Sequence, residues 1–350
     1  MNLLKIILET ERNLNEFAKK EIEKIIGTNV YENEFGLLEF ETDDFTTSIV
    51  RIFLFSETVY NLYLWMGYGE VKKPQDYYEI ASNISWSELW DVNKTFAVRP
   101  QVKNQEEIKI IGKHVGQAIV DDFKRRFGTK IKVNLSRPDF EVFVWKKDSK
   151  ILLGLNLNGE KRLNEFENVL ARSSLMFAEW SGEESLGEVL YAGTSLSAYR
   201  YSANMPRRER LLNTPLIRLN LLDKKRTLEL LRRSWKKEPT KIVLYERISK
   251  LNVLKQEEPE ISRLIIRDIE ELKNTNEDIL ISNLWLGLEK KSEQEEWLEK
   301  ILNMLKENSQ WKKLVIITTV DVKNIPFLIA NHKELSLKGN QVHLIAILNE

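Results

Sequence analysis

The spacing of apolar residues divides the chain into segments of strand and helix character. Over the first 84 residues the pattern alternates between the two, as strand, helix, strand, helix, strand, helix. The expected strands are at 3–8, 36–41 and 59–67, and the expected helices are at 14–26, 43–55 and 77–84. This order is typical of a small ferredoxin-like α+β unit.

Residues 95–162 show the clearest run of elements. Phe96–Arg99 alternates as in a short strand, and between Glu106 and Phe127 the apolar residues fall on one face of a helix. Gly128 ends the helical pattern. Three strand-like runs then follow, at Lys130–Leu135, Phe140–Trp145 and Ile151–Leu157.

Cations gather around the expected helix of this segment. They precede it, lie on its polar side, close it and continue into the following strands: Arg99, Lys103, Lys109, Lys113, Lys124, Arg125, Arg126, Lys130, Lys132 and Arg137. Such a cluster can contact RNA phosphates. The alternative is a solvated face, with cations placed where the dipole of a helix C-terminus favours them.

From residue 163 onward the pattern changes. A helix is expected over 163–180, and from Glu188 strands alternate with helical runs. The expected strands are at 188–192, 215–220, 241–245, 263–267, 278–282, 313–319 and 341–348, and the clearest helices are at 223–235 and 293–305. This alternation predicts a doubly wound, Rossmann-like sheet that binds ligands at the carboxyl ends of its strands.

Composition narrows the chemistry that the chain can perform. The 53 basic and 53 acidic residues give a formal net charge of zero, so RNA binding has to come from a local patch. The chain has no Cys, and His114, His332 and His343 are far apart in the sequence, so we expect no disulfide and no metal site. There is no leader-like start and no apolar run of about 20 residues. We therefore expect a cytoplasmic protein that does not enter a membrane.

Residues 95–162 resemble a THUMP domain, the RNA-binding module that precedes the catalytic domain in several tRNA and rRNA modification enzymes. The matching stretches are Phe96–Arg99, the helix at 110–127, Arg137–Val142 and Leu153–Gly159. The resemblance implies that this module binds RNA, with tRNA as the first expectation. The family usually continues with a His-Lys/Arg-Arg-Gly-Tyr-Arg run, whereas this chain has Lys161–Phe166 in its place.

The C-terminal part resembles the methyltransferase half of THUMP-containing tRNA guanine-N2-methyltransferases of the archaeal type. The matches are at 316–319, 331–333, 339–344 and, in the fourth-strand motif, 278–288. In that motif the enzymes have Asn-Leu/Pro-Pro-Tyr-Gly, where the Asn accepts from the target amino group and the aromatic ring stacks on the flipped base. Asn283 and Gly287 match, but Trp285 and Leu286 replace Pro and Tyr. The resemblance implies that Asn283 and Trp285 mark a degenerate catalytic position.

The S-adenosylmethionine loop of the family reads Asp-Pro-x-Cys-Gly-Ser-Gly-Thr, in which the glycines let the backbone approach the cofactor. The corresponding stretch here, Val189–Leu196, keeps only Gly193 of that pattern. Tyr191 and Ser195 are expected to intrude where the cofactor would lie. The pattern therefore argues against a complete S-adenosylmethionine site.

The acids that the family uses for the ribose and the adenine of the cofactor can be placed in two ways. If the second strand is at 241–245, Glu246 holds the ribose and Asp268 holds the adenine. If it is at 215–220, Asn220 stands at the ribose position and Glu246 at the adenine. We favour the second alignment, because its spacing from the first strand is more usual and a helical pattern follows it.

These patterns predict a ferredoxin-like unit at 1–70, a THUMP domain at 71–162, a linker helix at 163–180 and a degenerate methyltransferase-type domain at 181–350. We expect a catalytically impaired protein that binds tRNA and acts in RNA modification. It would act alone, as a homo-oligomer, or beside an active methyltransferase. The alternative is an active S-adenosylmethionine-dependent tRNA guanine-N2-methyltransferase with a divergent site.

Overall fold

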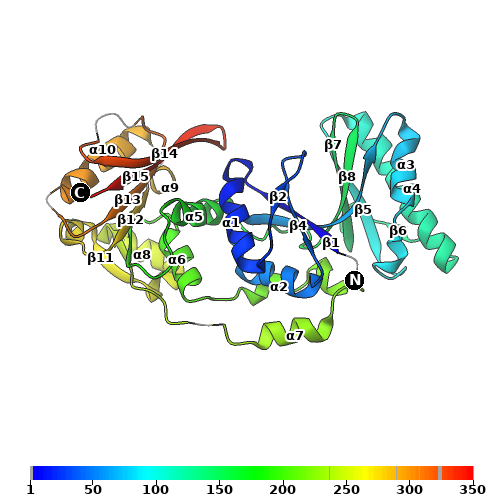
Figure 1. The fold of residues 1–350 in the computed structure, drawn as a ribbon, viewed down its shortest axis with the longest axis horizontal. Helices are drawn as coiled ribbons and strands as arrows, with labels where there is room; N and C mark the ends of the chain where they lie inside the picture. The colour runs from blue at the N-terminus through cyan, green and yellow to red at the C-terminus, as the bar shows by residue number, and fades with distance from the viewer. Residues whose placement is uncertain (1–2, 236, 289, 307, 322–324, 350) are drawn as a thin grey trace. The chain divides into compact units, whose positions relative to one another are not determined.

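The computed structural model describes residues 3–235, 237–288, 290–306, 308–321 and 325–349. The chain forms two compact units, each with its own mixed sheet (Figure 1). The first unit contains Met1–Asn15, Lys19–Leu163 and Arg207–Arg233, and the second contains Glu16–Ala18, Asn164–Pro206 and Ser234–Glu350. The mixed α/β class expected from the sequence is confirmed.

A single sheet runs through the whole first unit. Its order within the described residues is β2-β3-β1-β4-β8-β7-β5-β6. The strands are β1 (Leu4–Thr10), β2 (Tyr31–Glu32), β3 (Leu38–Thr42), β4 (Val59–Glu70), β5 (Thr95–Gln101), β6 (Lys132–Val133), β7 (Phe140–Lys147) and β8 (Lys150–Asn156). The long strand β4 joins both halves, because it pairs with β1 on one edge and with β8 on the other. A division at residue 70 into a ferredoxin-like part and a THUMP part stays a prediction.

The helices that precede residue 163 follow the expected order. They are α1 (Asn15–Ile26), α2 (Phe45–Phe55), α3 (Pro74–Ser82) and α4 (Gln105–Phe127). The longest of them, α4, begins at Asn104, whose side chain accepts hydrogen bonds from the amides of Glu106 and Glu107, and it ends at the left-handed Gly128. Figure 1 shows α4 lying alongside α3, against which it packs. The helix predicted between Glu106 and Phe127 is confirmed.

After a passage through the second unit, the chain returns to the first over residues 207–233. This returning segment contains a 3-10 turn at Pro215–Arg218 and the helix α7 (Lys224–Arg232), which lies beside α2 (Figure 1). The strand expected at 215–220 is therefore wrong. Pro215, Leu216 and Leu219 are buried while Ile217, Arg218 and Asn220 are exposed, so the apolar residues of this stretch pack in the core without forming a strand.

The second unit contains a doubly wound sheet. Within the described residues its order is β11-β10-β9-β12-β13-β15-β14, and β9 to β13 are parallel to one another. The strands are β9 (Leu186–Val189), β10 (Ile242–Glu246), β11 (Ile265–Asp268), β12 (Ile279–Asn283), β13 (Lys313–Thr318), β14 (Leu328–Leu337) and β15 (Asn340–Leu348). The direction of the strand order reverses between β9 and β12, and such a switch point is where ligands bind in sheets of this kind.

Helices of the second unit connect these strands. They are α5 (Phe166–Phe177), α6 (Thr194–Ser202), α8 (Ile248–Glu257), α9 (Leu284–Gly287) and α10 (Lys291–Leu305). Apolar residues of α10 pack with those of β12, β13 and β15 in one hydrophobic core. Among the helices that the structure describes, in either unit, none has the length and apolar character needed to cross a membrane.

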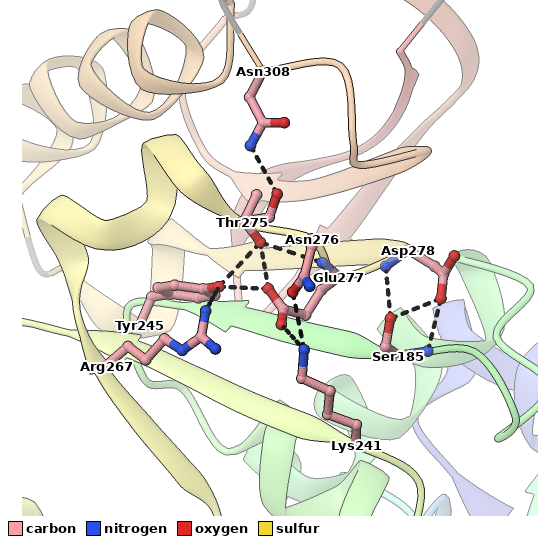
Figure 2. A network of polar contacts seen from close by, with 9 residues as sticks. All are labelled: Ser185, Lys241, Tyr245, Arg267, Thr275, Asn276, Glu277, Asp278 and Asn308. Atoms are coloured by element: carbon pink, nitrogen blue, oxygen red, sulfur yellow. Dashed lines mark hydrogen bonds and ion pairs between the residues drawn. The ribbon is translucent and has the colours of Figure 1, made fainter.

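A polar network sets the register of β9 against β12 at their amino-terminal ends (Figure 2). The amide and hydroxyl of Ser185 donate to Asp278 Oδ2 at 3.0 and 2.7 Å, and the amide of Asp278 donates to Ser185 Oγ at 2.9 Å. These bonds sit directly before the paired residues Leu186 and Ile279. A fixed register at this end determines which residues meet at the opposite, carboxyl edge.

Glu277 extends the same network to β10 (Figure 2). Its buried carboxylate accepts from the hydroxyls of Tyr245 and Thr275 and forms an ion pair with Lys241 Nζ at 2.8 Å. Burial acts to raise the pKa of Glu277, but the bonds from Lys241, Thr275 and Tyr245 outweigh it and lower the pKa. The carboxylate is thus held charged, and it ties β10 to the start of β12.

Candidate functional site

The turn between β9 and α6 lies at the switch point of the second sheet. Leu190 and Gly193 both have left-handed backbone conformations, with φ of 63° and 88°. A Cβ built on Gly193 would meet no described atom within 4 Å, so the space above this residue is open. Thr194 begins α6 directly after Gly193. The turn therefore presents an open backbone edge at the place where a ligand is expected.

Glu188 organises this turn from within β9. One oxygen of its fully buried carboxylate accepts from the amides of Ala192 and Thr194, both at 2.9 Å. The other accepts from the amide and hydroxyl of Ser195, at 3.0 and 2.5 Å. Burial raises the pKa of Glu188, and the bonds from Ser195 and the turn amides oppose this rise. Ser195 thus points into the interior, and the expectation that it intrudes on a cofactor is wrong.

Glu188 was not among the site residues predicted from the sequence. The available signal was an acidic residue inside an otherwise apolar strand, two positions before Leu190. Tyr191, the other residue expected to intrude, is half-buried, and burial and then the nearby charge of Glu188 raise the pKa of its phenol. Its backbone amide donates to Glu246 Oε2 at 3.0 Å, which links the turn to the next strand.

The second strand of this sheet is β10, because β10 pairs in parallel with β9. Glu246 ends β10, Asp268 ends β11, and the two acids are register partners. Glu246 is 2% exposed and also accepts from the amide of Arg247 at 2.7 Å. Asp268 caps the next turn by accepting from the amide of Glu270 at 2.9 Å. The alignment that places Glu246 and Asp268 at successive strand ends is therefore the one that the structure supports, while their cofactor roles stay a prediction.

Asn220 does not belong to this site. It lies in the returning segment of the first unit, where its backbone amide donates to Leu89 O and its side-chain amide to Glu88 O, both at 3.0 Å. The alignment that gave Asn220 the ribose position is therefore wrong. Residue spacing misled it, because the stretch between β9 and β10 includes a whole segment of the other unit.

Asn283 ends β12, next to β9 at the switch point. Its fully buried side chain accepts from the amide of Leu286 through Oδ1 at 3.1 Å, which starts the short helix α9. Its Nδ2 has no hydrogen-bond partner among the described residues, and neither has the buried Oγ1 of Thr194. Buried polar groups are rarely left unpaired. Two of them, at the end of β12 and at the start of α6, indicate a site that a ligand or water completes.

Gly287, in the turn after β12, lies against the turn after β9. A Cβ on Gly287 would lie 3.6 Å from the carbonyl oxygen of Tyr191. In the same turn, Trp285 packs edge-on against Phe166 of α5, with ring centroids 5.7 Å apart. The stacking of Trp285 on a base therefore stays a prediction, and would need this ring to leave or share its contact with Phe166.

The cations expected to bind RNA lie in the first unit. Lys109, Lys113 and Lys124 are exposed and fall on one face of α4. The remaining exposed cations of the predicted patch are Lys103, Arg125, Arg126, Lys130, Lys132 and Arg137. Next to them on the surface are exposed apolar side chains, among them Phe127 and Leu135.

Three of these predicted cations have partners within the protein, among them Arg125, whose Nη2 lies 3.8 Å from Asp122 Oδ1. Arg99 Nε donates to Glu141 at 2.7 Å and its Nη2 donates to the carbonyl of Leu135 at 2.9 Å, so Arg99 holds β5 to its neighbours. Arg126 pairs with Glu88 at 3.2 Å. An arginine that is already engaged in this way contributes less free charge to a phosphate-binding surface.

The returning segment is a second basic element, which was not predicted to belong to the RNA surface. Residues 207–233 contain nine Lys and Arg against three Asp and Glu. They lie in the same unit as α4, and Arg218 pairs with Asp139, just before β7, at 2.7 Å. A count of charge along short windows would have found this segment, but its assignment to the second domain hid its connection to the predicted RNA surface.

Comparison with known proteins identifies a domain within the first unit. The model of the THUMP domain matches residues 72–156. A tRNA (guanine(6)-N2)-methyltransferase of Methanocaldococcus jannaschii is 25% identical over 190 residues, which cover 49% of this chain and 49% of that protein. The chain thus matches only about half the length of this curated relative.

Solved structures share the fold over the whole chain. A possible methylase from Clostridium difficile 630 has a TM-score of 0.80 at 16% identity, covering 100% of this chain and 99% of the other. A candidate methyltransferase solved in complex with SAH has a TM-score of 0.80 at 12% identity, with the same coverage. The resemblances inferred from sequence are confirmed: the chain contains a THUMP domain on a methyltransferase-type fold and is related to archaeal tRNA guanine-N2-methyltransferases.

Proposed function

We propose that this chain binds S-adenosylmethionine at the carboxyl ends of β9 and β10 and methylates tRNA. The observation that carries the proposal is the buried Nδ2 of Asn283, which lacks a partner among the described residues although it lies at the switch point of the sheet. The tRNA (guanine(6)-N2)-methyltransferase relative and the SAH held by a protein of the same fold support the same interpretation.

The residues at this edge fit S-adenosylmethionine in three respects. The turn is open above Gly193, Glu246 ends the adjacent strand, and Asp268 ends the strand after it. The cofactor, when bound, supplies an electrophilic methyl group on a sulfonium. Each carboxylate oxygen can accept more than one hydrogen bond, so Glu246 can still hold ribose hydroxyls while it accepts from backbone amides. In this proposal Asp268, at the end of the strand after β10, receives the adenine amino group.

The free group of Asn283 is a hydrogen-bond donor, whereas the family resemblance implies an acceptor. Its Oδ1 already accepts from the amide of Leu286, so the free group is an N–H donor. A donor suits a carbonyl oxygen or a ring nitrogen of a base. Asn283 would therefore orient the target base, while the cations of α4 hold the RNA backbone.

A second candidate function is tRNA binding without catalysis, as a homo-oligomer or as a partner of an active methyltransferase. Trp285, one position before the family's stacking Tyr, favours it, because this ring packs against Phe166. Leu286, in the position of the family's Tyr, cannot stack in its place. The same tRNA would then be bound but not modified.

Calorimetry with S-adenosylmethionine, followed by transfer of labelled methyl groups to tRNA, separates the two functions. Methylation requires cofactor binding and predicts that Asn283→Ala lowers the transfer rate by about 100-fold, as loss of a positioned donor does elsewhere. Asn303→Ala, at an exposed position of α10, is the matched control and should keep the rate. If the chain binds tRNA but neither binds the cofactor nor transfers methyl groups, the second function, tRNA binding without catalysis, is supported. If the chain does not bind tRNA, both functions are contradicted.

A further inference from the structure

Two of the three histidines of the chain lie together on the hairpin of β14 and β15. Nε2 of His332 is 3.1 Å from Nδ1 of His343, and the ring centroids are 5.3 Å apart. Their distance in the sequence was the reason to expect no histidine-based metal cluster. Antiparallel pairing of the two strands brings them side by side.

Glu334 joins the pair as a third potential ligand. It is the register partner of His343, directly across the hairpin. His332 stands two residues before Glu334 and so projects from the same face of β14. Oε1 of Glu334 is 3.7 Å from Nδ1 of His343, and the three potential ligand atoms all lie within 4.8 Å of one another.

These separations suit a small tetrahedral ion. Zn²⁺ binds imidazole nitrogen and carboxylate oxygen at about 2.0–2.2 Å, so two ligands of one ion stand about 3.3 Å apart. The separations of 3.1 Å between the histidines and 3.7 Å from His343 to Glu334 lie on either side of that value. Since all three ligand atoms lie within 4.8 Å of one another, side-chain rotations that draw them together would place one ion between them.

A neighbouring residue fixes the orientation of the carboxylate. Gln341 donates through Nε2 to Glu334 Oε2 at 2.8 Å, and this bond leaves Oε1 directed towards His343. Such outer contacts orient metal ligands and raise affinity. The side chain of His343 is only 7% exposed, whereas His332 and Glu334 are exposed. The cluster thus has one anchored ligand and open access for an ion and water.

We propose that His332, Glu334 and His343 bind a divalent transition-metal ion, Zn²⁺ in the first place, with water as the fourth ligand. Two imidazoles with one carboxylate suit Zn²⁺, whereas Mg²⁺ and Ca²⁺ prefer sites built from oxygen alone. An ion at this place clamps β14 to β15 across the hairpin. Because the ligands come from both strands, metal binding is coupled to the folding of the hairpin.

The test uses the whole chain without a histidine tag, after treatment with a chelator. Zn²⁺ titrated by calorimetry should bind with one ion per chain and raise the melting temperature, and Co²⁺ should give the absorption of a tetrahedral site. His332→Ala and Glu334→Gln, both at exposed positions, should weaken Zn²⁺ binding by at least about tenfold. Gln341→Leu should weaken it less.

The third histidine provides a matched control. His114 lies on α4 in the first unit, and His114→Ala should leave Zn²⁺ affinity unchanged. Circular dichroism of each variant verifies that it is folded. The proposal is overturned if the unaltered chain does not bind Zn²⁺, or if the hairpin variants bind it as tightly as the unaltered chain does.

Discussion

At the scale of single residues, the candidate cofactor site depends on two buried carboxylates. Glu188 accepts four hydrogen bonds from the turn after β9, and Glu246 accepts from the amides of Tyr191 and Arg247. A buried charge requires such partners because its desolvation is costly. The protein thereby holds the turn in shape by itself, with the space above Gly193 left open.

Replacing Glu188 by Gln tests this role. One oxygen of the carboxylate becomes an NH₂ group, which faces N–H donors of the turn and cannot accept from them. We expect Glu188→Gln to lower the free energy of unfolding by about 1–3 kcal/mol, measured by chemical denaturation. Glu183→Gln, an exposed position before β9, should have no such effect, and equal stability of the two variants would contradict the assignment.

Asp278 provides a pH-dependent prediction. Lys312 and Ser185 lower its pKa to about 2, against an ordinary value of 3.8. A pKa that is lower in the folded state adds stability above the unfolded value, and this stability is lost as the pH falls from about 4 to about 2. The exposed Lys312 is screened by water, so we expect about 1 kcal/mol. Denaturation at pH 7 should find Asp278→Asn less stable than the unaltered protein, and the difference should shrink at about pH 2.5. If the difference in stability between the two proteins is the same at pH 7 and at about pH 2.5, the role assigned to Asp278 is contradicted.

At the scale of elements, periodicity predicted best where a long segment buries one face. The helix α4 and the strands β7 and β8 lie where the spacing of apolar residues predicted them, because apolar residues of each pack in the core. The edge strand β14 was missed, since most of its residues are exposed and show no alternation. The hairpin cluster of His332, Glu334 and His343 was missed for the same reason: without β14 nothing connects them.

The lysine face of α4 yields a prediction about RNA binding. Lys109, Lys113 and Lys124 are exposed on one side of the helix, where each can contact a phosphate. Replacing all three by Ala should weaken tRNA binding at low salt. It should also reduce the slope of log K against log salt concentration by about 2 to 3, close to one for each phosphate that the variant no longer neutralises. Filter binding or fluorescence anisotropy over a salt series measures both.

A matched triple variant controls for the loss of total charge. Lys255, Lys273 and Lys291 are exposed and lie in the second unit. Their replacement by Ala removes the same charge but should leave the salt slope nearly as it was. If both triple variants change the slope equally, the α4 face is only a solvated surface and the RNA is bound elsewhere.

At the scale of the whole molecule, the domain order expected from the sequence failed at one segment. The pattern from Glu188 onward was assigned to one continuous sheet, but the returning segment packs in the first unit. Its apolar residues satisfy local periodicity equally well in either unit, so periodicity could not decide between them. The segment packs near β8 and α2, which are distant in the chain, and such long-range packing leaves no trace in local sequence.

Truncation of a buried side chain in this segment tests its place. Leu216 is fully buried, and its amide donates to Leu157 O at 3.2 Å, just beyond β8. Leu216→Ala should lower stability by about 2–5 kcal/mol. Hydrogen exchange should locate the reduced protection in β4 and β8 of the first unit. Leu302→Ala, in the core of the second unit, should instead reduce protection in the strands of the second unit and leave β4 and β8 protected. Reduced protection confined to β9 and β10 in Leu216→Ala would refute the assignment.

The return of the chain has a consequence for how this protein can be divided. Apart from Glu16–Ala18, the backbone passes between the units at residues 163–164, 206–207 and 233–234. One proteolytic cut at any of these crossings leaves at least one fragment that contributes residues to both units, so the units stay linked for as long as they remain folded. Recombination that exchanges the THUMP-containing half for another must likewise carry two separate stretches of coding sequence, so end-to-end gene fusion cannot assemble this architecture from two finished modules.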